Sequence, residues 1–381
     1  MTGSPAAHAR PAVVLGHDTL TEIGGAERVV AAWAERWPDA PLLTAAVDRR
    51  LLDGSLATHP LRVSPLGRLA GDKRRAKAMF PLVPLAFRAL PVPAADILLT
   101  SSSAFAHHLR PRPGTLHAWY CHTPPRFLWD GDAYFREQPA LGRGLGPVLA
   151  ALRHADRAAA ARVNLVIANS RHTAARVRVI YGREAEVLLP PVPVDRFTPT
   201  TERSGRLLVL SRLLPYKSIE VAIAAAAQAG LALDIVGEGP DRPRLERLAG
   251  PGVTFHGRLS DAEARARLAR CVALLVPGRE DLGITVVEAQ ASGRPPIALA
   301  DGGATETIED GASGFLVQDG HPGAFAAAIR RAQEDAIPAG ALVAAARRLD
   351  TPVFTAALDR LLDVALAERA AARTFAGVVG A

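Results

Sequence analysis

The stretch GREDLGITVVEAQASG, residues 278–293, places Glu280 and Glu288 eight residues apart on either side of Gly283. It directly follows the apolar run VALLVP, where a buried strand is expected to give way to a helix. Carboxylates accept hydrogen bonds from vicinal hydroxyls, and a helix N-terminus attracts phosphate. A capping box explains the same residues, with Glu288 reaching back to the amide of Thr285 and Glu280 as an exposed loop acid. The residues alone leave both interpretations open.

A pair of cations, Arg212 and Lys217, follows another apolar run in the stretch LSRLLPYKS. Two cations at the C-terminal end of a strand can clamp a diphosphate, because Arg supplies a planar fork and Lys a point charge. For any single pair of this kind, two solvated surface cations are the more common explanation. The pair therefore predicts a phosphate site only if other such groups accompany it.

Two glycines, Gly24 and Gly25, open a predicted helix in the stretch HDTLTEIGGAERVV, after a strand expected to end at His17–Asp18. Paired glycines let backbone amides approach a phosphate closely, and the helix N-terminus adds partial positive charge. A plain strand-to-helix turn explains them equally well. A third glycine at the spacing of a dinucleotide-binding fingerprint is missing here, and also in VGEGPDRP.

His122 ends a predicted strand in YCHTPPRFLWD and precedes two prolines that stop regular structure. A histidine in this position can contact a sugar hydroxyl or act beside a reaction centre. A histidine satisfied by backbone groups is the simpler explanation. The following DGD, residues 130–132, resembles a metal-binding carboxylate pair, but Asp and Gly are ordinary turn residues, so we predict no metal site.

The composition is that of a folded protein of about two domains, with 381 residues, 49% of them hydrophobic and 22% charged. The net charge of +7 favours anionic partners such as nucleotide phosphates, nucleic acid or a membrane surface, although a solvated arginine-rich face explains it too. Apolar runs fall short of the ~18 residues of a membrane span. The N-terminal residues lack the order of a secretory signal, so we expect a cytoplasmic protein. Cys121 and Cys271 are too few for a disulfide framework or a cysteine metal cluster.

Short apolar runs alternate with alanine-rich helical segments along the whole chain, which predicts an α/β protein with parallel sheets covered on both faces. One predicted helix carries Val29, Val30, Trp33 and Trp37 at helical spacing. We expect strands at residues 11–18, 41–47, 95–103, 115–122, 163–170, 185–191, 206–212, 231–237, 253–257, 272–277, 295–300 and 314–317.

The proline-rich stretch PPVPVDRFTPTTERSG, residues 190–205, predicts a linker between two doubly wound domains. We expect an N-terminal acceptor-side domain over residues 1–194 and a donor-binding domain over 195–350. The last stretch, 351–381, is expected to form a helix that returns to the first domain. Because such sheets bind ligands at the C-terminal ends of their strands, we expect the two domains to face across a cleft.

These stretches, taken together, resemble the family-4 (group 1) retaining glycosyltransferases, whose two Rossmann-like domains define the GT-B fold. PGREDLGITVVEAQASGRPPIALADGGATETI is similar to the family signature of two glutamates separated by seven residues. HDTLTEIGGAERVV, YCHTPPRFLWD, IANSRHTAARVRVIYGREAEVLLPPVPVDRF and SRLLPYKSIEVAI follow the order and spacing of the family. The resemblance extends over roughly residues 11–350 and looks closest to bacterial GDP-mannose-dependent mannosyltransferases.

The resemblance implies roles for the candidate residues. Glu288 would bind the ribose hydroxyls, Glu280 the hydroxyls of the donor sugar, and His122 the sugar near its anomeric carbon. The cations would neutralise the diphosphate, with Gly24 and Gly25 approaching it and the base lying near residues 256–259. Implied catalytic residues are Glu280, His122, Arg212 and Lys217. Implied donor-binding residues are Gly24, Gly25, Arg212, Lys217, Arg258, Leu259, Glu280, Leu282, Gly283, Ile284, Thr285 and Glu288.

The implied reaction is metal-independent, retaining transfer of a hexose, for which mannose from GDP-mannose is the expected donor. The acceptor would be a hydroxyl of a glycan, a glycolipid or a small molecule. The sequence departs from the family at Leu282, where phenylalanine is common, at Pro296, where valine is usual, and at His107, where lysine is expected. These departures affect the shape of the sugar pocket, so a UDP-sugar such as UDP-glucose or UDP-N-acetylglucosamine stays an alternative.

Two further classes of function compete with this interpretation. A nucleotide-sugar epimerase of the same fold would isomerise a donor and need no acceptor. A nucleic-acid-binding protein would explain the charge, but the basic residues are dispersed without interleaved aromatics, so we expect no nucleic-acid partner. The stretch GDKRRAKAMFPLVPLAFRALPVP, residues 71–93, combines four cations with an apolar run. It predicts either peripheral docking on an anionic membrane, at the inner face of the cell membrane, or a helix packed on its own sheet.

Overall fold

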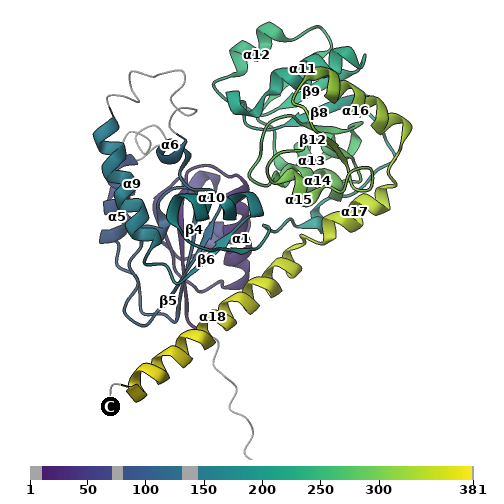
Figure 1. Cartoon of the computed structure of the whole chain (residues 1–381). Helices are drawn as coiled ribbons and strands as arrows, with labels where there is room; N and C mark the ends of the chain where they lie inside the picture. Colours follow the sequence, from purple (N-terminus) through teal and green to yellow (C-terminus); the bar gives the residue numbers. More distant parts are fainter. Residues whose placement is uncertain (1–10, 71–79, 131–144, 380–381) are drawn as a thin grey trace, which may run out of the picture. The chain divides into compact units, whose positions relative to one another are not determined.

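A computed structural model describes residues 11–70, 80–130 and 145–379 of the chain. These residues form two compact units, which are described separately. Unit 1 takes the described part of Met1–Asn169 together with Thr173–Leu188 and Thr355–Ala381, and unit 2 takes Ser170–His172 and Leu189–Phe354. Helices and strands are labelled as in Figure 1.

Unit 1 is built on a parallel sheet that has, within the described residues, seven strands in the order β3-β2-β1-β4-β5-β6-β7. Strands β4 and β5 are buried at every residue, and β1 nearly so, because helices cover both faces. The strands are β1 (Val13–Leu20), β2 (Leu42–Val47), β3 (Leu61–Val63), β4 (Ile97–Ser102), β5 (Leu116–Cys121), β6 (Leu165–Ala168) and β7 (Glu186–Val187).

Several helices of unit 1 pack on this sheet through apolar clusters, two of which lie wholly within the described residues. One cluster joins Leu98 of the sheet to Phe105 and Leu149, and the other joins Trp119 to Val163 and Val177. The helices are α1 (Gly25–Arg36), α2 (Gly54–Thr58), α3 (Pro65–Ala70), α5 (Val83–Ala89), α6 (Arg126–Trp129), α9 (Gly146–Ala160), α10 (Arg171–Tyr181) and α18 (Thr351–Val379), with short 3-10 turns η1 (Arg49–Leu51), η2 (Phe80–Leu82) and η3 (Ala106–His108).

Unit 2 repeats the plan with a parallel sheet that has, in the described chain, six strands in the order β10-β9-β8-β11-β12-β13. Along its central strand, Leu207 and Val209 face one apolar cluster while Leu208 faces the other, as the two-residue period of a strand requires. The strands are β8 (Arg206–Leu210), β9 (Ala232–Val236), β10 (Val253–Gly257), β11 (Leu274–Val276), β12 (Pro296–Leu299) and β13 (Phe315–Val317).

The helices of unit 2 cover both faces of its sheet (Figure 1). They are α11 (Ile219–Gln228), α12 (Arg242–Leu248), α13 (Asp261–Arg270), α14 (Ile284–Ala291), α15 (Ala304–Thr307), α16 (Pro322–Glu334) and α17 (Ala339–Arg347), with 3-10 turns η4 (Val194–Arg196) and η5 (Pro215–Lys217). Val192 and Val194, which belong to the proline-rich stretch, are buried in unit 2 against Leu282.

Each sheet reverses its strand order once, between β1 and β4 in unit 1 and between β8 and β11 in unit 2. In doubly wound sheets, ligands bind at the C-terminal ends of the two strands that flank this switch point. The prediction of two doubly wound α/β sheets is confirmed. Two details were wrong: β3 was not predicted, and β1 continues to Leu20, so His17 and Asp18 lie inside the strand rather than at its end.

The C-terminal helix α18 follows α17 directly and is 29 residues long (Figure 1). From Thr355 onward it belongs to unit 1, where Asp359 accepts hydrogen bonds from Arg36 of α1 at 3.0 Å and 3.3 Å. The sequence predicted a helix over residues 351–381, and α18 is that helix. None of the helices described here is long and apolar enough to cross a membrane.

Candidate functional site

The switch point of unit 2 brings together three of the predicted residues. Lys217 comes from the loop after β8, whereas Glu280 and Thr285 come from the segment after β11, and all three line one small pocket. The ammonium group of Lys217 donates to a carboxylate oxygen of Glu280, and both side chains are less than one-fifth exposed. A cation and an acid thus meet where this fold binds its ligands.

The backbone holds Lys217 in this place. Pro215 begins the 3-10 turn η5, and Ser218 ends it with a φ of 52°, a left-handed conformation that non-glycine residues rarely adopt. The loop after β11 lies directly against this turn, since a Cβ atom on Gly278 would come within 2.6 Å of the Cα atom of Lys217. Glycine at 278 is therefore what permits the two loops to meet.

Gly283 is the N-cap of α14, with a φ of 79° that favours glycine. Because the helix begins at Ile284, Thr285 already lies in its first turn and is not the capping residue. The predicted capping box is therefore wrong. Glu288 is buried in the helix, with 3% of its surface exposed, whereas Glu280 precedes the helix and is fixed by its carbonyl, which accepts from the amide of Gly303 at 2.9 Å.

Other residues predicted to bind the donor lie elsewhere in unit 2. Arg212 is exposed and does not line the pocket of Lys217. Leu282 and Ile284 direct their side chains into the apolar cluster with Val192. Arg258 is exposed beyond the end of β10.

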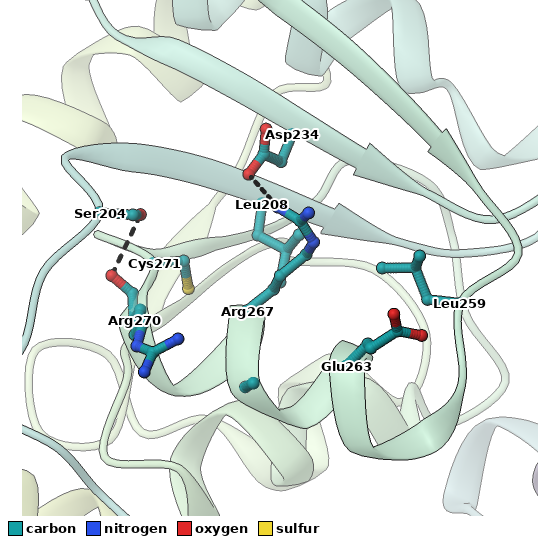
Figure 2. Close-up of a pocket in the computed structure, with 9 residues that line it drawn as sticks. Ser204, Leu208, Asp234, Leu259, Glu263, Arg267, Arg270 and Cys271 are labelled. Atoms are coloured by element: carbon teal, nitrogen blue, oxygen red, sulfur yellow. Dashed lines mark hydrogen bonds and ion pairs between the residues drawn. The ribbon is translucent and has the colours of Figure 1, made fainter.

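Leu259 lines a second pocket, of about 290 Å³, between α13 and the sheet (Figure 2). Asp234 of β9 points into this space, where it accepts hydrogen bonds from Arg267 of α13 at 3.3 Å and from Arg206 at 2.8 Å. Arg270 and the buried thiol of Cys271 line its other end (Figure 2), and burial raises the pKa of this thiol to about 12. Ser204 and Cys271, which line this pocket, precede β8 and β11, so it lies away from the C-terminal ends of these strands and we do not assign the donor to it.

The switch point of unit 1 is occupied by a carboxylate of the protein itself. Asp18 of β1 accepts four backbone N–H groups from the turn after β4, those of Ser103, Ala104, Phe105 and Ala106, at 2.6–2.8 Å. Backbone amides that converge in this way form an anion-binding concavity. The place where this fold commonly binds a ligand anion is thus filled by the side chain of Asp18.

His122 stands beside this anchor in a buried chain of hydrogen bonds. Its Nε2 atom lies 2.7 Å from the hydroxyl of Ser101, and the Nδ1 atom of His17 lies 3.1 Å from the same hydroxyl. The Nε2 atom of His17 lies 3.3 Å from the carboxylate of Glu27, which also accepts from the amide of Gly24 at 2.8 Å. Gly24 therefore caps α1 with its amide donated to Glu27, and Gly25 is exposed.

The two histidines of this chain have opposite electrostatic character. Burial alone lowers the pKa of His17, but the hydrogen bond and negative charge of Glu27, together with Asp18, outweigh it and raise that pKa above 6.5. Burial and the nearby charge of His17 lower the pKa of His122 to about 3. His122 is consequently neutral at physiological pH.

His107, which stands where the resemblance predicts a lysine, forms a second buried group with Asp156. Its Nε2 atom lies 2.9 Å from Asp156, and its ring stacks on Trp119 at 4.2 Å between centroids. Asp156 also accepts from Trp129 and Tyr181 at 2.8 Å and 2.7 Å. The interaction with His107 above all, with help from His108 and Tyr181, holds the pKa of Asp156 well below the usual range against the opposing effect of burial. His107 thus pairs with an acid in the core of unit 1.

Sequence reasoning missed Asp18, Glu27 and Ser101 as functional residues. The signal was present, because HDTLTEIGGAE and SSS each place polar residues beside a predicted strand end. Residues 131–132 of the DGD motif and 71–79 of the predicted membrane-docking stretch lie outside the described residues.

The fold and the site define a class of protein. Proteins of this class have two Rossmann-like units, and here the ligand-binding edge is in unit 2. Residues 195–349 match the family model for glycosyl transferases group 1, so the chain contains a glycosyltransferase group 1 domain. Its α/β architecture is that of the GT-B fold.

Relatives and solved structures agree with this assignment. The chain is 32% identical over 220 residues to a D-inositol 3-phosphate glycosyltransferase of Geodermatophilus obscurus, covering 48% of each. It is 33% identical over 180 residues to a GDP-mannose-dependent alpha-(1-6)-phosphatidylinositol monomannoside mannosyltransferase of Mycolicibacterium smegmatis, covering 39% of this chain and 47% of that one. The chain spans about half the length of the curated relatives it matches.

Among solved structures, the fold is similar to that of Anabaena HepE in complex with UDP, with a TM-score of 0.69, 20% identity, and coverage of 92% of this chain and 99% of that one. Sucrose-phosphate synthase from Thermosynechococcus elongatus gives a TM-score of 0.71 at 19% identity, covering 93% and 100%. At these identities the likeness shows the shared fold.

Proposed function

We propose that this protein is a retaining hexosyltransferase that moves mannose from GDP-mannose to a hydroxyl acceptor. The observation that carries the proposal is the pairing of Lys217 with Glu280 in the pocket at the switch point of unit 2. A single cation on the surface would be weak evidence for a ligand site. The side chain of Lys217, however, is at least four-fifths buried and lies beside a helix cap whose backbone is in the left-handed conformation. That setting suits a diphosphate sugar.

The proposed chemistry assigns a separate task to each of the two charges. A diphosphate entering the pocket competes with Glu280 for the ammonium group of Lys217, which then neutralises the charge that develops on the departing diphosphate. Glu280 is thereby freed to accept hydrogen bonds from the sugar hydroxyls. Catalysis is mostly electrostatic, with the acceptor hydroxyl held in position to attack from the face that the diphosphate leaves. The reaction as proposed needs no metal ion.

The choice of donor and acceptor rests on what the relatives are named for. GDP-mannose appears in the name of the Mycolicibacterium relative, and inositol appears in the names of both relatives described above. An acceptor that carries an inositol hydroxyl is therefore the first to test. A UDP-sugar is the second candidate donor, because HepE was solved with UDP-glucose.

A panel of purified donors tests the proposal. The full chain is incubated with GDP-mannose, UDP-glucose or UDP-N-acetylglucosamine, each with and without inositol 3-phosphate or phosphatidylinositol, and released nucleotide and glycosylated product are measured. We expect GDP release and a mannosylated acceptor, unchanged by EDTA. An isomerised sugar formed without acceptor would instead identify an epimerase, and binding of none of these donors would overturn the proposal.

Two variants locate the activity within unit 2. Lys217→Ala removes the cation from the switch-point pocket, whereas Arg270→Ala removes a cation from the pocket in Figure 2. We expect the first to abolish most of the turnover and the second to stay within about twofold of the unmodified protein. The opposite pattern would move the donor site to the second pocket.

A further inference from the structure

The hydrogen-bond chain of unit 1 determines where each of its protons lies. Both ring nitrogens of His17 face oxygen atoms that accept hydrogen bonds: Nδ1 lies 3.2 Å from the backbone carbonyl of Ser101, and Nε2 lies 3.3 Å from the carboxylate of Glu27. A carbonyl and a carboxylate have no proton to give. A bare Nδ1 would face the carbonyl and could be satisfied only by the hydroxyl of Ser101, 3.1 Å away. A ring protonated on both nitrogens satisfies the carbonyl and the carboxylate together, so this geometry favours protons on both nitrogens of His17.

The protonation of His17 fixes the direction of the next hydrogen bond. Its Nδ1–H points at the carbonyl and the hydroxyl oxygen of Ser101, so that hydroxyl cannot direct its own proton back at His17. The remaining partner of the hydroxyl is the Nε2 atom of His122, at 2.7 Å. Ser101 therefore donates to His122, and a nitrogen that accepts a proton in a hydrogen bond carries none itself.

We propose that Ser101 is a positioning residue that fixes the tautomer of His122, with Nε2 unprotonated and the proton on Nδ1. The carboxylate of Glu27 maintains this arrangement from α1 by keeping His17 doubly protonated. None of the motifs in the sequence indicated this role, because the serine and the glutamate lie on different elements, 74 residues apart.

The electrostatics of the unit agree with the hydrogen-bond geometry. The charged groups that act on His17 are Glu27 from α1 and Asp18 from β1, both negative, and they raise its pKa against the effect of burial. The positive charge of His17 in turn adds to burial in lowering the pKa of His122. Both effects favour a positive charge on His17 and a neutral ring with one N–H donor on His122.

This assignment matters for the proposed function, on which the following consequence rests. A neutral His122 with its proton fixed on Nδ1 presents a hydrogen-bond donor to a ligand oxygen without reorganisation. In the other tautomer Nδ1 would be an acceptor. His122 could then donate to the ligand only after its ring or the hydroxyl of Ser101 had reoriented. Fixing the tautomer therefore preorganises His122 for a sugar hydroxyl or a phosphate oxygen.

Long-range ¹H–¹⁵N NMR correlation of the histidine rings tests the assignment without any turnover. The full chain is labelled with ¹⁵N-histidine, and the signals of His122 and His17 are identified by their loss in His122→Gln and His17→Gln. At neutral pH we expect His122 to show a protonated Nδ1 and a bare Nε2, and His17 to show two protonated nitrogens. A protonated Nε2 on His122 in the unmodified protein would overturn the proposal.

Two matched serine variants separate positioning from folding. Ser101→Ala removes the donor to His122, so we expect the Nε2-protonated tautomer to gain intensity. Ser103→Ala, in the same serine run, keeps the amide that binds Asp18, so it should leave the tautomer unchanged. If Ser101→Ala folds and leaves the His122 signals as they were, Ser101 does not position the ring. Because the spectra need no donor sugar, this result is independent of whether the protein transfers a hexose.

Discussion

The two sheets use the same topological position in opposite ways. At the switch point of unit 1 the carboxylate of Asp18 binds four backbone amides, and the histidines around it are buried and linked by hydrogen bonds. At the switch point of unit 2 the opposing charges of Lys217 and Glu280 line a pocket. In unit 1 a carboxylate of the chain fills the switch point, and in unit 2 we propose that a ligand separates the pair.

This difference teaches how one fold divides two tasks. A buried network that is fully satisfied rigidifies the region that contains it, because every member is costly to leave without a partner. A mostly buried ion pair of one cation and one acid can exchange a partner for the charge of a ligand, so neither charge is left unpaired when the ligand binds. We therefore expect changes at the switch point of unit 1 to affect folding, and changes at that of unit 2 to affect activity.

The largest effect is expected for Asp18→Ala, which removes the acceptor of four backbone amides. The free energy of unfolding should fall by about 4 kcal/mol, since hydrogen bonds to a charged group are among the strongest and leave unsatisfied donors behind. Urea unfolding followed by circular dichroism measures this loss. A decrease below about 1 kcal/mol would show that the network does not hold unit 1 together.

Lys217→Ala tests the comparison at the switch point of unit 2. Loss of the cation that stabilises the leaving group should lower kcat/KM for the donor by about 10²–10³, equivalent to about 3–4 kcal/mol. The variant should remain folded, with a smaller loss of unfolding free energy than Asp18→Ala, because only one acid loses its partner. A variant that loses stability but keeps its turnover would reverse the roles given to the two regions.

The buried histidines of unit 1 predict a loss of stability in mild acid. Burial lowers the pKa of His117 and His122 to about 3 and that of His108 to about 4. Below pH 6.5, the ordinary pKa of histidine, these side chains bind protons in the unfolded chain but stay neutral in the folded chain. The free energy of unfolding therefore falls as the pH decreases. His17 acts in the opposite sense, because its raised pKa adds stability below 6.5 that is lost as the pH rises.

A single substitution measures one part of this dependence. His108 lies 3.6 Å from Asp156, beyond hydrogen-bonding distance, so leucine can replace it without breaking a hydrogen bond. Between pH 6 and about pH 5, His108→Leu should reduce the slope of unfolding free energy against pH by about 1.4 kcal/mol per unit. An unchanged slope, measured by urea unfolding across this range, would mean that His108 is protonated in the folded state.

The smallest effect is expected for Gly283→Ala. Alanine at a φ of 79° costs about 1 kcal/mol, and distortion of the cap should weaken donor binding by about fivefold. Gly205→Ala is the matched control, because Gly205 has a φ of 68° with open space around it and does not line the pocket of Lys217. It should lose similar stability and no affinity in calorimetric titration with GDP-mannose. Equal losses of affinity in both variants would exclude a specific role for the cap.

The sequence predicted the repeated fold well, because its signals are local and redundant. Each buried strand is an apolar run between helical segments, and this pattern recurs in both units. The order in which strands pair depends on distant contacts, and the three-residue strand β3 is too short to show a period. For the same reason β1 was expected to end at His17–Asp18, where the apolar run stops, although polar side chains satisfied by β4 let it continue.

The candidate site was predictable where a motif lies in one segment and hidden where it joins several. Gly283 and Glu280 follow one strand, so their stretch could be interpreted directly. The capping box failed because glycine in a left-handed conformation takes the N-cap position ahead of Thr285. The partnership of Ser101 with Glu27 joins two elements across the sheet, and only the folded backbone brings them together.

The most direct test of the account is product formation from GDP-mannose by the unmodified protein, Lys217→Ala and Asp18→Ala, measured beside the folded fraction of each. The account predicts that Lys217→Ala stays folded and loses about 10²–10³ of its transfer rate. It also predicts that the activity of Asp18→Ala falls in proportion to its folded fraction. Transfer by folded Lys217→Ala at the unmodified rate would contradict the assignment of the donor site to the switch-point pocket of unit 2.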